Sequence, residues 1–232
     1  MAIPAVDKSC PTYPYRRIIN GNRFEGAELI PYKIMMYLLD LPDAYGYEPV
    51  DDNSRPRVKL MKYLWYDDAN PLSQPLPTPE EKRSLLFDLY RPTINTDEDK
   101  ARHPKGYRLF MQRNIGQSIL DAKTILKIYP GRVLDPTEFR SILGFQCEIW
   151  ANPNLVTNTK TTFYDRIWDI ECALRDSLND IDMAGVGLIK FSRNDGSFNG
   201  SENTYADDGS VGRVIYFSTA WMGGGSEPVE KF

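Results

Sequence analysis

The residues that could do chemistry are few in this 232-residue chain and lie far apart. His103 is the single histidine, so a catalytic triad or a histidine metal site would have to be built around it. It precedes Pro104 in a charged stretch, where we expect an exposed structural side chain. Cys147 falls on the apolar side of a predicted strand and Cys172 beside the apolar stripe of a predicted helix. Both are therefore predicted to be small core residues.

Carboxylates could instead serve a metal-dependent hydrolase or nuclease, which remains an alternative function. Its catalytic residues would be Asp135, Glu138 and Glu148. A nuclease motif would place a lysine two residues after a strand carboxylate, but Trp150 occupies that position after Glu148. Glu98 and Lys100 have the spacing without a second strand carboxylate beside them. We therefore expect no catalytic residue, no metal and no bound cofactor; metal-dependent cleavage abolished by Glu148→Ala would support the alternative.

Two polar loops are rich in glycine and in oxygen atoms that could bind calcium. Residues 195–200 and 207–210 lack the regular ligand spacing of a calcium loop, so a solvated hairpin tip is the expected structure. The surrounding stretch, residues 193–212, keeps a further alternative open, a module that binds a glycan or a host surface.

Composition limits the function classes further. Hydrophobic residues make up 41% and charged residues 26% of the chain, as is typical of a globular protein. The formal net charge is −4 and no Lys/Arg block stands out, so a dedicated nucleic-acid binder is not expected. No apolar run approaches the roughly 20 residues of a membrane span, and no secretory signal is visible. Three cysteines without paired spacing, Cys10 included, favour synthesis in a reducing cytoplasm.

The element expected to organise the fold is a helix followed by a strand at residues 163–192. Its apolar stripe comprises Phe163, Ile167, Ile170, Leu174, Leu178 and Ile181. Asp165, Arg166, Asp169, Arg175 and Asp176 fall between them and are predicted to face water. Gly185 is expected to end the helix, after which residues 186–191 form a strand.

Other strands are predicted at residues 107–113, 124–129, 140–150 and 213–219, the last pairing with 186–192 as a hairpin. Short helices are predicted at 31–41, at 56–66 and from Pro79 to the residue before Pro92, with residues 93–105 as a surface loop. The expected fold class is α+β, a mainly antiparallel sheet with a helix packed on one face, preceded by short helices and extended proline-rich loops. The organisation predicted is an extended arm (1–22), helices and ordered loops (23–106), the α+β core (107–222) and a tail (223–232).

The order of elements in the second half resembles that of proteins at the head–tail junction of tailed bacteriophages. The resemblance runs over residues 123–219 and includes Ile-Tyr-Pro-Gly-Arg at 128–132, the strand at 144–150, the helix and the strand at 186–191. Tail-terminator, neck and connector subunits are the families most similar to it. The long first half departs from a minimal terminator.

The resemblance implies a non-enzymatic virion protein, made in the host cytoplasm, that forms a ring of six or twelve copies. Its partners would be other copies of itself and portal, neck or tail-tube proteins, with DNA passing through the lumen without sequence-specific binding and no membrane. A ring subunit needs two different surfaces that meet head to tail. We expect the contacts at residues 1–22, 151–161 and 193–212, because these stretches combine extended chain with polar loops.

Overall fold

A computed structural model describes residues 29–68, 70–88, 90–113, 124–134, 141–152, 166–191, 200–205 and 211–221. The arm predicted at residues 1–22 and the tail predicted at 223–232 lie outside these ranges. The helices are α1 (Ile30–Leu38), α2 (Pro56–Trp65), α3 (Pro79–Ser84), α4 (Asp97–Arg102) and α6 (Arg166–Leu178), with a 3-10 turn η2 at Pro71–Ser73. The strands are β1 (Leu109–Phe110), β2 (Thr124–Leu134), β3 (Ser141–Ala151), β4 (Asp182–Met183), β5 (Gly187–Lys190), β6 (Ser201–Tyr205) and β7 (Val211–Trp221).

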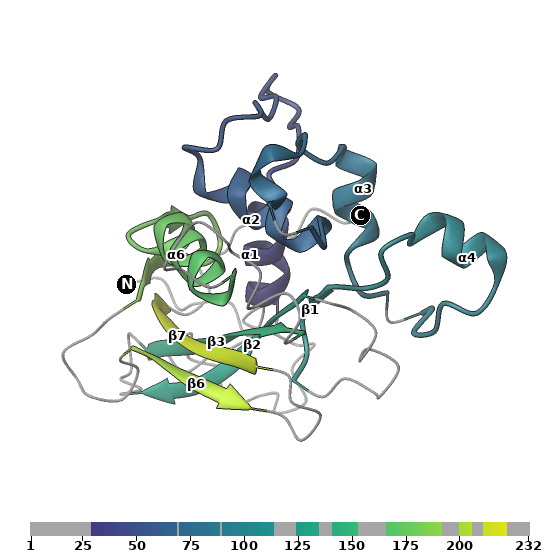
Figure 1. Cartoon of the computed structure of the whole chain (residues 1–232). Helices are drawn as coiled ribbons and strands as arrows, with labels where there is room; N and C mark the ends of the chain where they lie inside the picture. Colours follow the sequence, from purple (N-terminus) through teal and green to yellow (C-terminus); the bar gives the residue numbers. More distant parts are fainter. Residues whose placement is uncertain are drawn as a thin grey trace, which may run out of the picture.

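The strands form one sheet that is mainly antiparallel (Figure 1). Its centre is a ribbon in which β2 pairs with β3, β3 with β7 and β7 with β6, each antiparallel to its neighbour. The short β1 is parallel to β2, and β5 pairs with β7 beyond the end of β6. The α+β class and the antiparallel character of the sheet are thus confirmed. The predicted pairing of the strand after the long helix with the last strand is confirmed by the register of Ile189 opposite Thr219.

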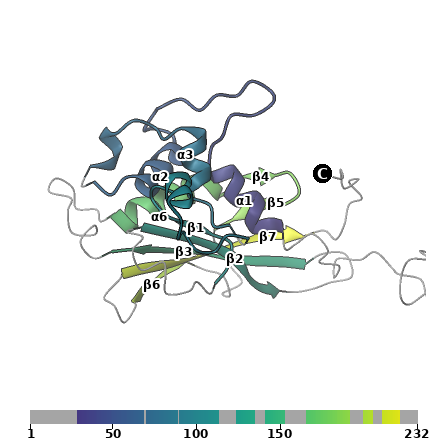
Figure 2. The ribbon, with the colours of Figure 1, turned by 90° about the vertical axis from the view of Figure 1, so that its right-hand side faces the viewer.

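Helices and strands share one large hydrophobic cluster. Fully buried members include Leu38 of α1, Leu64 of α2, Leu174 of α6, Phe145 of β3 and Phe217 of β7. The rings of Phe145 and Phe217 stack with their centroids 5.5 Å apart. In Figures 1 and 2, α1, α2 and α6 lie together on one side of β2, β3 and β7. The first half of the chain therefore contributes directly to the core that the strands use.

Local sequence signals explain where the first helices begin. α1 and α2 each carry proline in the first turn, where the missing N–H has no helical acceptor to lose. α3 begins with a capping box in which the Thr78 hydroxyl accepts from the Glu81 amide and the Glu81 carboxylate accepts from the Thr78 amide. Thr96 and Asp99 form the same box at the start of α4. Residues 93–105 were expected to form a surface loop, and this was wrong because they contain the short exposed helix α4.

The third helix is shorter than its sequence pattern predicts. It ends at Ser84, whereas the apolar residues after it led us to expect a helix that stops only before Pro92. The backbone carbonyl of Leu85 accepts hydrogen bonds from the amides of Arg108 and Leu109, at 2.8 and 3.0 Å. The chain therefore leaves the helix because a segment distant in sequence pairs with its backbone.

Two strands differ from their predicted extents. β2 was expected to stop at Pro130, but it continues through Pro130 and Gly131 to Leu134. Its register with β3 shifts between Pro130 and Val133, and proline is tolerated at such bulges and at sheet edges because no ladder hydrogen bond is lost. The excursion predicted at residues 193–212 contains a strand, β6, instead of an irregular tip alone.

The long helix has the expected apolar stripe but different limits. Ile167, Ile170, Leu174 and Leu178 are buried in α6, as predicted. The helix ends at Leu178, and Asp180 takes the left-handed conformation (φ 64°) that Gly185 was expected to supply. Gly185 instead has φ 67° between the strands β4 and β5.

Candidate functional site

The candidate site is the half-exposed face of the antiparallel ribbon, which we call the open face. The β3 alternation predicted from sequence is confirmed, since Phe145, Cys147 and Ile149 are buried. Gln146, Glu148 and Trp150 are half-buried on the opposite face. The register places Lys127 and Tyr129 of β2 beside them, and Val214 and Tyr216 of β7 on their other side.

Glu148 is the centre of the hydrogen bonds on the open face. Its Oε2 atom accepts from the Lys127 ammonium at 3.0 Å and from the Trp150 indole N–H at 3.0 Å. Its Oε1 atom accepts from the Tyr129 hydroxyl. Three donors from two strands therefore fix a single carboxylate.

These donors also set the ionisation of the cluster. Burial raises the pKa of Glu148, but the hydrogen bonds from Tyr129 and Trp150 and the contact with Lys127 outweigh it, so its pKa lies below the ordinary value. Burial and the adjacent carboxylate of Glu148 raise the pKa of Tyr129. At neutral pH the cluster is thus a carboxylate bound by a neutral phenol, an indole and an ammonium, an arrangement that holds two strands in register.

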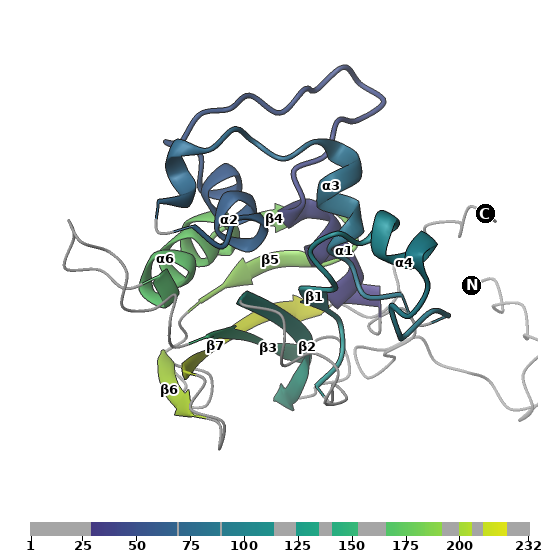
Figure 3. The ribbon, with the colours of Figure 1, turned by 45° about the vertical axis from the view of Figure 1, so that its right-hand side comes forward.

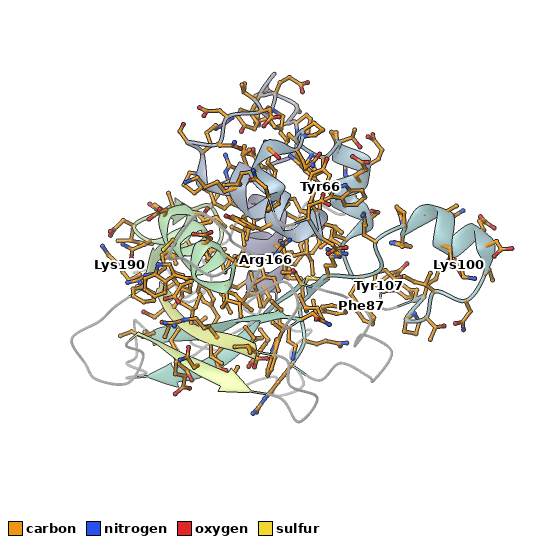
Figure 4. All side chains as sticks on the ribbon, in the orientation of Figure 1. Tyr66, Phe87, Lys100, Tyr107, Arg166 and Lys190 are labelled. Carbon is orange, nitrogen blue, oxygen red and sulfur yellow. The ribbon has the colours of Figure 1, made fainter. Side chains whose placement is uncertain are left out.

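The two ends of the open face differ in character. At one end, Trp150 packs against a small second cluster that includes Tyr107 and Phe110. Phe87 joins it with its ring edge-on to Tyr107, at 5.3 Å between centroids (Figure 4). At the other end, a shallow pocket of about 410 Å³ is lined by polar and apolar side chains, among them Arg113, Tyr129, Pro130 and Gln146.

The ribbon has two unlike outer edges. On the outer side of β2, β1 pairs with it only at Leu126 and Lys127. From Tyr129 onward, this outer side of β2 has no strand beside it among the described residues. On the other side, β6 pairs with β7 alone within the same ranges. The Gly200 carbonyl accepts from the Tyr216 amide at 3.3 Å. Because antiparallel bonding alternates along a strand, the amides of Ser201 and Asn203 point away from β7.

The other predicted candidates are not brought together. His103 is half-buried instead of exposed, with its Nδ1 atom 2.6 Å from the Ser84 carbonyl oxygen and its ring against Tyr107. Cys147 is fully buried, which confirms its place in the core, and burial raises its thiol pKa. Cys172 is only half-buried and does not belong to the core, contrary to expectation.

Only some of the acidic candidates lie within the described residues. Glu98 pairs with Arg102 at 2.5 Å on the exposed helix α4, where Lys100 lies 3.5 Å from Asp97. Asp135, Glu138, residues 195–199 and residues 207–210 lie outside the described residues. Within the described ranges, no three histidine, cysteine or acidic side chains are placed to hold a metal ion.

No helix in the described part of the chain is long and apolar enough to cross a membrane. No protein-family model matches the chain, and no curated protein matches it.

Sequence reasoning missed the edge strand β6. Its residues, Ser-Glu-Asn-Thr-Tyr, include only one β-branched side chain and are mostly polar, so they do not stand out from the surrounding loop. Its place is set by the pairing with β7, in which Glu202 and Thr204 lie opposite Val214 and Gly212 on the open face.

Proposed function

We propose that this protein is a non-enzymatic structural component of a tailed-bacteriophage virion that forms a closed ring at the neck. It would act as a tail terminator or head–tail connector, joining the capsid and portal to the tail while leaving a channel for DNA. Its partners would be other copies of itself and neighbouring portal, neck or tail-tube proteins, with no membrane involved. The proposal rests on the resemblance of residues 123–219 and on one observation, the unlike edges of the ribbon.

Two unlike edges are what a head-to-tail ring requires. A self-complementary edge would give closed pairs, whereas β6 of one subunit meeting β2 of the next adds copies by rotation until the ring closes. The ribbon order β2, β3, β7, β6 alternates in strand direction. A β6–β2 contact would therefore remain antiparallel across the subunit boundary, extending the sheet by main-chain hydrogen bonds.

The charge of the open face suits a channel surface. Lys127 is paired with Glu148, and Glu202 on β6 accepts a hydrogen bond from Tyr216. Because this face is not basic, it would not grip phosphates as a nucleic-acid binder does. In this proposal α6, with α1 and α2, forms a helical layer on the opposite face of the sheet, on the outside of the ring.

The ring contact can be tested at Asn203. Asn203→Pro removes the backbone N–H that points away from β7, so no hydrogen bond to β7 is lost. Asn203→Thr keeps this backbone N–H. Both variants lose the carboxamide side chain of Asn203. Both variants lose the bond that the Asn203 side chain accepts from Arg213 at 3.0 Å. We expect electron microscopy and native mass spectrometry of the full chain to show sixfold or twelvefold rings for the parent and the threonine variant. The proline variant should remain monomeric.

Three results would contradict the proposal. One is a monomer at high concentration that also fails to bind portal or tail-tube proteins of the same virus. Another is a ring whose lumen is strongly basic. The third is assembly that is the same for the proline and threonine variants.

A further inference from the structure

A second pocket, remote from the open face, is lined by residues of α1, the loop that follows it, α2 and α3. Figure 3 shows how these elements are arranged. We call it the arginine pocket. Its volume is about 480 Å³, within the range of small-molecule sites. Its lining includes Tyr37, Leu41, Pro42, Tyr47, Arg57 and Arg83.

Arg57 is held rigidly in this lining. Its Nη1 atom donates to the Tyr37 carbonyl at 3.1 Å, and its Nη2 atom lies 2.9 Å from Oδ1 of the buried Asp40. The guanidinium lies over the Tyr37 ring, 4.5 Å from its centroid, and 5.8 Å from that of Tyr47. Its Nη2 atom also donates to the Tyr47 hydroxyl at 3.5 Å. A guanidinium has five N–H donors, so these three contacts leave two donors of Arg57 without a partner among the described residues.

Arg83 supplies a second cation from α3. It is exposed, and it makes no ion pair within the described ranges. The fork of Arg83 is suited to bidentate binding of a carboxylate or phosphate, because the planar guanidinium matches the geometry of these groups. Arg57 adds its positive charge and its remaining donors.

The charges around the arginine pocket favour an anion. Arg55 lies over the Tyr47 ring at 5.3 Å, and the buried Lys82 donates to the Asp40 carbonyl at 2.9 Å. With Arg57 and Arg83 this makes four cations, against the three carboxylates of Asp40, Asp43 and Asp52, the last of which lies near Arg55. Asp43 is already engaged, since its Oδ1 accepts the amides of Tyr45 and Tyr47 at 2.9 Å each.

The remaining wall is suited to the body of a ligand. Met36, Leu41 and Pro42 line the same pocket as the two arginines, and the ring of Tyr37 adds a flat surface. An inorganic ion would leave this wall in contact with water, whereas an aromatic or aliphatic body would bury it.

We propose that the arginine pocket binds a small organic anion, with its carboxylate or phosphate group between Arg57 and Arg83 and its apolar body against Leu41 and Pro42. This site does not depend on the ring and lies outside the open face. The oxyanion can belong to a carboxylic acid or to a phosphate monoester, because the two arginines recognise both groups in the same way.

The test is calorimetric titration of the full chain with phenyl phosphate, benzoate and inorganic phosphate. Arg83→Gln is the informative variant, because Arg83 is exposed and its loss leaves no buried charge unpaired. Arg102→Gln on α4 is the matched control, with the same charge change outside the pocket. We expect one-to-one binding of phenyl phosphate or benzoate, weakened at least about tenfold by Arg83→Gln and unchanged by Arg102→Gln.

Whichever of phenyl phosphate and benzoate binds more tightly shows whether the pocket prefers a phosphate or a carboxylate group. Three outcomes overturn the proposal. The first is that neither phenyl phosphate nor benzoate binds. The second is that Arg83→Gln and Arg102→Gln bind these ligands equally well, and the third is that inorganic phosphate binds as tightly as phenyl phosphate. A glutamate-rich peptide that binds more tightly than both ligands, through Arg83, would also overturn it by assigning the pocket to a protein partner.

Discussion

The guanidinium of Arg166, at the start of α6, donates a 2.6 Å hydrogen bond to the backbone carbonyl of Tyr63, near the end of α2. The same side chain donates to the carbonyls of Tyr66 and, at 3.1 Å, of Asp68. These carbonyls lie at the negative end of the α2 dipole, where a cation is favoured. Arg166 is labelled beside α6 in Figure 4. Burial lowers its pKa to about 10, so it remains charged at neutral pH.

Arg166→Met should destabilise the protein substantially. Methionine preserves much of the apolar stem but leaves the buried carbonyl of Tyr63 and the half-buried carbonyl of Tyr66 without this donor. We expect a loss of about 2–4 kcal/mol in the free energy of unfolding, measured by urea denaturation. Arg102→Met, at an exposed position, is the control and should change stability by less than about 0.5 kcal/mol. Equal effects of the two variants would contradict the role assigned to Arg166.

The Glu148 cluster predicts a pH-dependent stability. Because the folded-state pKa of Glu148 lies below its ordinary value of 4.5, the ionised carboxylate stabilises the fold above that pH. The contribution is lost as pH falls through the folded-state pKa. Glu148→Gln should therefore cost about 1–2 kcal/mol at neutral pH and less in acid. Urea denaturation at several pH values measures this, with the exposed Glu98→Gln as control; a pH-independent difference would be the contrary result.

Gly212 should not tolerate even a methyl group. A Cβ atom there would lie 2.7 Å from the Ile149 carbonyl oxygen and 3.0 Å from the Trp150 ring. Since a strand carbonyl cannot move aside easily, Gly212→Ala should cost about 1–3 kcal/mol of stability. Gly131→Ala, whose nearest contact is the Gly144 oxygen at 3.2 Å, should cost less. Thermal unfolding of both variants gives the comparison, and the reverse order would contradict this packing.

The Asp40–Arg57 pair predicts a strong coupling. The Asp40 side chain is fully buried, with its carboxylate bound by Arg57 and by the Tyr47 hydroxyl at 2.6 Å. Arg57→Met should cost about 3 kcal/mol, because it leaves a buried charge without its cation. Asp40→Asn in that background should recover part of the loss, since asparagine also accepts the left-handed backbone at this position (φ 51°). A double-mutant cycle in urea measures the coupling, and strictly additive effects would argue against it.

Most local structure follows from short sequence signals. Proline in the first turn and the capping boxes at Thr78 and Thr96 determine where helices begin, because these contacts involve neighbouring residues only. The period-two alternation of residues 145–150 predicts the two faces of β3, and the stripe from Ile167 to Leu178 predicts the buried side of α6. The α+β class and the hairpin partner of the last strand follow from the order of these elements.

Features that depend on distant residues could not be read from the chain. Arg166 was expected in water because it falls between the apolar stripe positions of the helix, yet its partners are carbonyls at and just after the end of a helix about a hundred positions earlier. The end of α3 depends on backbone pairing with Arg108, and the extension of β2 through Pro130 depends on its place at an edge.

The candidate sites divide in the same way. Sequence alone determined which side chains of β3 share a face, because alternation is a property of the strand backbone itself. Only the tertiary structure decided that Tyr129 and Lys127 donate to Glu148, and that Arg57 and Arg83 line one pocket. The physical reason is that a strand or helix fixes the direction of its own side chains, whereas the partner that a side chain meets depends on how separate elements pack.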